Sequence, residues 1–282
     1  MLETYTHNTH IPGPRFLFLG SVHGNEPCGS LAIDAIREKI NSGEIKILNG
    51  NITFIPRVNA QAYISKKRFI DVNLNRVVKK TKNPTTYEDK IAQELLTEIE
   101  KADYVVDLHS MTAKTVPIVF VDYITQGNID LANATGLSDF IYGWSELYAE
   151  TEQNSDTISY TNSVGVAGVT IECGQHDDPK SFSVACASII NILNTYGVIK
   201  STTPHIYNKE VSAYSMQKIY FKKHRDDTLV KNFKNFDLIK AGELIAKREN
   251  GEKITSETKG YIMLPNDSVE KGQEWFYFGY KI

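Results

Sequence analysis

The chain has 282 residues, of which 41% are hydrophobic and 23% are charged, as in an ordinary globular protein. Its formal net charge of −3 argues against a nucleic-acid partner, and no apolar run is long enough to predict a membrane helix. The N-terminus lacks the basic and apolar regions of a signal peptide, and the three cysteines form no CxxC pair. We therefore expect a cytoplasmic protein that binds neither nucleic acid nor membrane.

Short apolar runs alternate with amphipathic stretches through the first two thirds of the chain. The runs are bounded by Gly, Pro, Asn or Asp and predict strands at Phe16–Leu19, Ile52–Ile55, Tyr104–Leu108, Ile118–Val121 and Val169–Ile171. Apolar residues at helical spacing predict three helices. The first follows Glu26, the second has Pro84 in its first turn, and the third runs from Pro179 and ends at Gly197. This alternation predicts an α/β fold, with helices flanking a largely parallel or mixed sheet.

The pattern changes near Ser201, where helical periodicity fades and short strand-like segments alternate with Gly-containing turns. The net charge shifts at the same point, from −6 over residues 1–200 to +3 over residues 201–282. We predict a boundary at Thr203–Pro204, which separates a catalytic domain (1–203) from a small all-β domain (204–282).

Two predicted strands are followed by residues of the types that often bind metal ions in proteins. His23 and Glu26 lie three apart directly after the first strand, and His109 directly follows the strand that begins at Tyr104. Ligands in open α/β sheets gather beyond the carboxyl ends of the strands, and two His with one Glu leave a tetrahedral zinc one open position for water. Alternatively, these residues form a structural polar cluster. Asp107 lies on the strand face of His109 and would either orient that ring or make an ordinary buried hydrogen bond.

Two further segments carry candidate residues for chemistry. Arg68, Asn75 and Arg76 lie among apolar residues and could clamp a carboxylate, although a solvated loop would look the same. Glu172 ends an apolar strand next to a Cys-Gly pair. Burial there would raise its pKa and suit it to act as a general base, whereas the alternative is a carboxylate paired with a Lys or Arg.

Four segments, taken in order, resemble the succinylglutamate desuccinylase/aspartoacylase family, a branch of the zinc carboxypeptidase-like hydrolases. They are HGNE at His23–Glu26, RFIDVNLNR at Arg68–Arg76, DLHS at Asp107–Ser110 and IECG at Ile171–Gly174. The resemblance covers about residues 15–195 and implies a zinc-carboxypeptidase-like fold.

The resemblance also implies a role for each candidate residue. One zinc ion per chain would be held by His23, Glu26 and His109, with Glu172 as the general acid/base. Arg68 would polarise the scissile carbonyl, while Asn75 and Arg76 would grip a substrate carboxylate. The implied activity is removal of the acyl group from an N-acyl amino acid, a small molecule that bears a carboxylate. The β domain would cap the active site and narrow its entrance.

The sequence departs from the family pattern at two places. Asn73 replaces an acidic residue of the family, and the arginine that aspartoacylases place about ten residues before Glu172 is replaced by the neutral stretch Tyr160–Ser163. The acyl group, the amino acid and any homo-oligomer therefore stay open. Two competing hypotheses are a metallocarboxypeptidase acting on short peptides and a catalytically silent binding module on the same fold.

Overall fold

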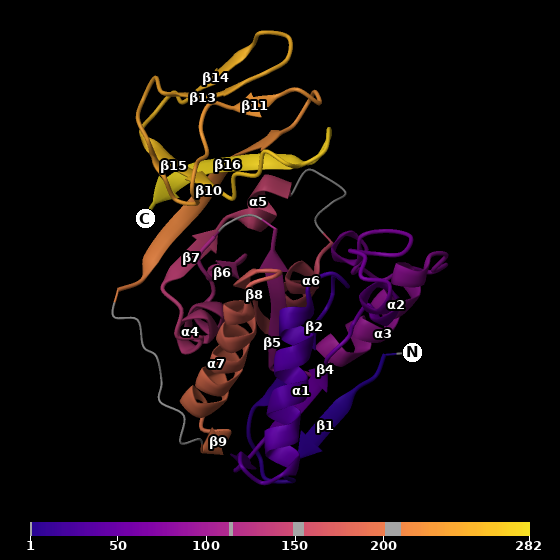
Figure 1. Ribbon diagram of the computed structural model, residues 1–282. Helices are drawn as coiled ribbons and strands as arrows, with labels where there is room; N and C mark the ends of the chain where they lie inside the picture. The colour runs from indigo at the N-terminus through magenta and orange to yellow at the C-terminus, as the bar shows by residue number, and fades with distance from the viewer. Residues whose placement is uncertain (1, 113–114, 149–154, 201–209) are drawn as a thin grey trace.

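The computed structural model describes residues 2–112, 115–148, 155–200 and 210–282. Within them, a mixed sheet of eleven strands runs in the order β1-β4-β2-β5-β8-β6-β7-β10-β16-β15-β12 (Figure 1). Its strands are β1 Tyr5–Asn8, β2 Arg15–Gly20, β4 Asn51–Ile55, β5 Tyr104–Met111, β6 Ile118–Val121, β7 Asp139–Tyr142, β8 Ala167–Gln175, β10 Ser212–Phe221, β12 Leu238–Ile239, β15 Gly260–Met263 and β16 Glu274–Lys281. Two small sheets pair β3 Lys46–Ile47 with β9 Ile199–Lys200, and β11 Thr228–Leu229 with β13 Leu244–Lys247 and β14 Lys253–Thr255.

Helices cover both faces of the N-terminal part of the sheet, because side chains alternate between the faces along each strand. The helical segments are α1 Pro27–Asn41, α2 Ala60–Ile64, η1 Leu74–Arg76, α3 Tyr87–Ile99, α4 Gln126–Ala134, α5 Trp144–Tyr148, α6 Thr157–Ser163 and α7 Pro179–Thr195. Phe16 and Phe18 of β2 pack in one core with helices α1, α4 and α7. Leu17 and Leu19 point to the opposite face and pack in a second core with helices α3 and α6. In the described part of the chain, no helix is long and apolar enough to cross a membrane.

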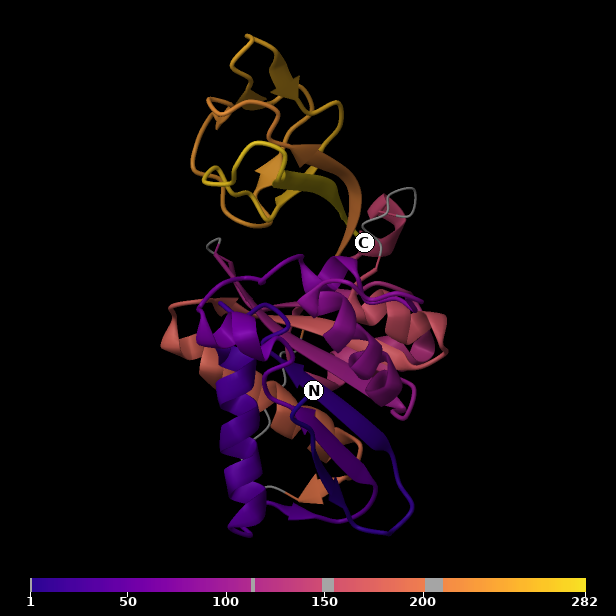
Figure 2. The same cartoon turned by 90° about the vertical axis from the view of Figure 1, so that its right-hand side faces the viewer.

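The strands after residue 210 continue the main sheet. β10 pairs in parallel with β7 through Ser212–Ser215 and antiparallel with β16, so the hydrogen-bonded ladder passes directly from one part to the other. These strands also enclose a core of their own around Trp275 and Phe276, and Figure 2 shows them above the helix-flanked part of the sheet. The predicted boundary at Thr203–Pro204 lies outside the described residues, so the division into two domains stays a prediction.

The predicted fold class is confirmed, and each of the five predicted strands lies within a strand of the structure. The helix from Pro179 begins as predicted after Asp178, whose side chain accepts a hydrogen bond from Lys180 N, and it ends just before Gly197 at φ +67°. The expected first-turn position of Pro84 is wrong. Helix α3 begins at Tyr87 because Thr86 and Asp89 form a reciprocal capping box there.

Candidate active site

Three neighbouring parallel strands bring the candidate residues together. Strand β5 lies between β2 and β8, and their carboxyl ends meet at one edge of the sheet. The His23 turn follows β2, His109 lies near the end of β5, and Glu172 lies opposite His109 in the register of β8. The turn needs glycine at Gly24, because a Cβ there would lie 2.1 Å from the backbone carbon of Ala62.

The three predicted metal ligands converge on one point. Nδ1 of His23 lies 3.0 Å from Oε1 of Glu26, and Nδ1 of His109 lies 2.8 Å from Oε2 of the same carboxylate. All three side chains are buried, and their ligand atoms lie within 4.8 Å of one another. This cluster could hold a metal ion, since imidazole nitrogens and a carboxylate oxygen are the donors that zinc accepts.

The outer nitrogens of both imidazole rings lie near oxygen atoms, although in the described residues Nε2 of His109 makes no hydrogen bond. Nε2 of His23 lies 3.0 Å from Oδ1 of Asn73, and Nε2 of His109 lies 2.9 Å from Oδ2 of Asp107. A proton on each Nε2 leaves the Nδ1 lone pairs directed at Glu26, as a metal site requires. The donor set therefore fits a zinc ion. Asn73 replaces the family's acidic residue but still presents an oxygen to the ring.

The charge balance of the cluster also suits a cation. Burial opposes ionisation of Glu26, but the charges of His23 and His109 hold its pKa well below the usual value. Burial, followed by the charge of Arg68, lowers the pKa of His23 to about 4. A neutral His23 beside an ionised Glu26 suits a metal ion. Burial lowers the pKa of His109, but the charges of Asp107 and Glu26 outweigh it and raise that pKa well above its usual value, so metal binding would displace a proton from His109.

Glu172 is a buried carboxyl group in the same site. Burial and then the charge of Glu26 raise its pKa to about 8, although the charges of His109 and Arg68 oppose this rise. Among the described residues, its Oε2 atom is buried and has no hydrogen-bond partner. A carboxyl group in this state can exchange a proton with a bound molecule near neutral pH.

The two candidate arginines enter the site with different partners. Nη1 of Arg68 lies 2.7 Å from Oε1 of Glu26, with its side chain 46% exposed. Arg76 donates to the carbonyl of Asn75 at 2.8 Å and to Oε1 of Glu274 at 3.2 Å. The side chain of Asn75 accepts from Thr157 N at 3.3 Å.

The sequence reasoning missed the residue that fixes the loop of Arg68. Glu88, fully buried at the start of α3, accepts from the backbone N–H groups of Ile70, Asp71 and Val72 at 2.7, 3.1 and 3.2 Å. It also accepts from Nδ2 of Asn59 at 3.0 Å. One carboxylate thus satisfies three consecutive donors directly after Arg68. Its position within an amphipathic helix gave no sign of this role.

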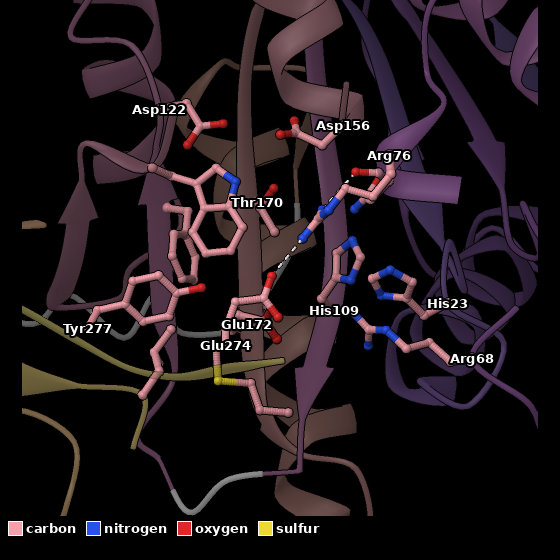
Figure 3. Close-up of a pocket in the computed structure, with 15 residues that line it drawn as sticks. His23, Arg68, Arg76, His109, Asp122, Asp156, Thr170, Glu172, Glu274 and Tyr277 are labelled. Atoms are coloured by element: carbon pink, nitrogen blue, oxygen red, sulfur yellow. Dashed lines mark hydrogen bonds and ion pairs between the residues drawn. The ribbon is translucent and has the colours of Figure 1, made fainter. Parts of the chain in front are cut away.

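A cavity with an empty volume of about 710 Å³, part of it open to solvent, connects these residues (Figure 3). Six of the seven predicted site residues line it. The seventh, Glu26, contacts His23, His109 and Arg68. The other lining residues of the cavity were not predicted as site residues: Met111, Phe120, Asp122, Trp144, Asp156, Thr170, Leu264, Glu274 and Tyr277. Of the last three, Glu274 and Tyr277 lie in β16 and Leu264 directly follows β15, so the part of the chain after residue 210 contributes a wall of the cavity.

The comparisons with known proteins identify the family of the chain. The family model described as "Succinylglutamate desuccinylase/Aspartoacylase catalytic domain" matches residues 12–195. The chain belongs to this family. The family predicted from the four motifs is thus confirmed, and the matched range includes all seven predicted site residues.

Solved structures share this fold over nearly the whole chain. A succinylglutamate desuccinylase/aspartoacylase from Rhodobacter sphaeroides is 18% identical, with a TM-score of 0.78 over 100% of this chain and 90% of that one. The product-bound ectoine utilization protein EutE (DoeB) from Ruegeria pomeroyi is 19% identical, with a TM-score of 0.76 over 98% and 88%. An aspartoacylase family protein from Mesorhizobium loti is 17% identical, with a TM-score of 0.72 over 100% and 89%. No curated protein matches the chain in sequence.

Proposed function

We propose that the protein is a zinc-dependent amidohydrolase that removes the acyl group from an N-acyl amino acid, with one zinc ion held by His23, Glu26 and His109. The observation that carries the proposal is the convergence of two Nδ1 atoms on the two oxygens of one buried carboxylate. Family membership supports the same reaction class.

The surrounding residues supply the rest of the chemistry. Zinc would act as a Lewis acid and lower the pKa of water from about 15.7 toward 7. Glu172 accepts the proton of the attacking water and returns it to the leaving amine. A cation bound by Glu26 also removes one cause of the raised pKa of Glu172, which favours the ionised base.

The two arginines have separate tasks in this proposal. Arg68 donates to the carbonyl oxygen as it gains negative charge, a contribution of about 3–4 kcal/mol for one well-placed donor. Arg76 and Asn75 orient the substrate through its carboxylate. Because Arg76 already contacts Glu274 at 3.2 Å, a substrate carboxylate shares or replaces that contact.

The wall from the strands after residue 210 favours small substrates. Leu264, Glu274 and Tyr277 line the cavity that contains the metal cluster, so the entrance is bounded on the side of the C-terminal strands. This supports a cap that excludes long peptides, as the prediction of a capping domain implies. A small N-acyl amino acid suits such a cavity better than a peptide chain does.

Metal analysis followed by a substrate panel tests the proposal. The purified protein should contain about one zinc per chain and hydrolyse N-acyl amino acids faster than dipeptides of similar size. Faster cleavage of dipeptides would favour the metallocarboxypeptidase instead. A protein that binds no zinc and cleaves neither class would be a silent binding module, and the proposal would be wrong.

A further inference from the structure

Two carboxyl groups lie at the end of the cavity away from the metal cluster. Asp122 directly follows β6, and Asp156 precedes α6; Figure 3 shows both beyond Arg76, with Glu172 and the histidines at the opposite end. Asp156 is 7% exposed and accepts from Ser159 N at 2.7 Å and Ser159 Oγ at 2.8 Å. These bonds hold the Asp156 side chain in place as part of the cavity wall.

The cation that acts on Asp156 is Arg76, which already pairs with Glu274. Burial, followed by the charge of Asp156, raises the pKa of Asp122 well above its usual value. Burial also raises the pKa of Asp156, although bonds from Ser159 and the charge of Arg76 oppose this. A cation placed between two such carboxylates would let both ionise and would recover the cost of burying them.

Three aromatic side chains line the same cavity as the acidic pair. The ring of Trp144 lies 5.6 Å from that of Phe120 and 5.6 Å from that of Tyr277, and all three line the cavity. Aromatic faces attract ammonium groups, and tryptophan does so most strongly. This is a second feature, independent of the carboxylates, that suits a cation.

The cations of the cavity already have partners. Arg68 pairs with Glu26, and Arg76 pairs with Glu274. Four carboxyl groups line the cavity against two guanidinium groups: Asp122, Asp156, Glu172 and Glu274 against Arg68 and Arg76. A second substrate carboxylate would thus meet further carboxyl groups at the end of the cavity, while both guanidinium groups already pair with glutamates.

We propose that the cavity selects N-acyl amino acids whose side chain ends in an ammonium group, bound by Asp122 and Asp156 against the ring of Trp144. The inference rests on the proposed deacylase function. With the substrate carboxylate at Arg76, whose charge acts on Asp156, the side chain extends toward the acidic pair. The cavity thus binds a positively charged substrate side chain, whereas a deacylase specific for aspartate or glutamate must bind a negatively charged one.

Three substrates of similar size test the inference on the zinc-loaded wild-type protein. Nα-acetyl-ornithine, Nα-acetyl-norvaline and Nα-acetyl-glutamate end in an ammonium, a methyl and a carboxylate group. We expect kcat/KM to be about 10- to 100-fold higher for the ornithine compound than for the norvaline compound, and lowest for the glutamate compound. Equal or faster turnover of the glutamate compound would overturn the inference while the deacylase function stands.

Variants and a binding measurement complete the test. Asp122→Asn should reduce the ornithine-to-norvaline ratio of kcat/KM by about tenfold or more, whereas Asp130→Asn, on the exposed side of α4, should leave it unchanged. An unaltered ratio in a folded Asp122→Asn protein would refute the role of Asp122. If no N-acyl amino acid is cleaved, the proposed function fails. Calorimetry with free ornithine, norvaline and glutamate then decides the inference, because ornithine must still bind most tightly.

Discussion

Replacing Glu88 with glutamine should lower the free energy of unfolding more than the loss of an ordinary helix cap does. The glutamine oxygen can still accept from Ile70 N and from Asn59, but its NH₂ group would face the N–H groups of Asp71 and Val72, now 3.1 and 3.2 Å from the carboxylate. Two hydrogen bonds to a charged group are lost, each worth about 1.5–3 kcal/mol. The free energy of unfolding should therefore fall by about 3–6 kcal/mol.

Urea unfolding of metal-free protein measures this loss, because bound zinc would add a stabilisation of its own. The matched control is Asp89→Asn, which weakens the capping box at the same helix end and should cost only about 0.5–2 kcal/mol. In the zinc-loaded protein, Glu88→Gln should also lower kcat, because the loop after Arg68 loses its anchor. A Glu88→Gln protein that unfolds within about 1 kcal/mol of the control would refute this account of the loop.

Four further outcomes are expected. His23→Ala and His109→Ala should each abolish zinc binding, measured as metal per chain; full occupancy in both would contradict the ligand set. Glu172→Gln should retain zinc but lose about 10²–10⁴-fold in kcat, and near-normal turnover would remove Glu172 from the mechanism. In metal-free protein, the pKa of Glu172 rises on folding from 4.5 to about 8, so its contribution favours folding below pH 4.5 and is lost as the pH rises through 8. Glu172→Gln should therefore gain stability relative to wild type between these pH values in urea titrations, and a constant difference would argue against the shift. Arg76→Ala should mainly raise KM and Arg68→Ala should mainly lower kcat; equal penalties from Arg76→Ala on carboxylate and methyl-ester substrates would mean that Arg76 is structural.

The metal cluster could be predicted from sequence because its residues lie in short local patterns. His23 and Glu26 belong to one turn, and His109 directly follows the apolar run of a central strand. Such strands are apolar along most of their length, so their ends are visible in the sequence. The short strand β7 and the edge strand β1 were missed because β1 reads Tyr-Thr-His-Asn and β7 begins with an aspartate, patterns that resemble loops.

The far end of the cavity could not be predicted, because only tertiary structure assembles it. Asp156 reads as an ordinary helix-capping residue, and Asp122 reads as a polar residue that ends a strand. Glu274 comes from a strand near the C-terminus, yet its carboxylate contacts Arg76. None of these residues carries a local signal for a ligand. The same is true of Glu88, whose three backbone partners lie in a different segment of the chain.

The parallel ladder between β7 and β10 has a mechanical consequence for substrate entry. Four consecutive register pairs, from Ser212 opposite Asp139 to Ser215 opposite Tyr142, join the sheet to the strands that carry Glu274 and Tyr277. Swinging those strands away as a rigid lid would shear this ladder and leave two unpaired strand edges. We therefore expect sheet register to set the width of the cavity, and molecules to enter it through rotations of side chains such as Arg76 and Glu274, which take place faster than domain motions.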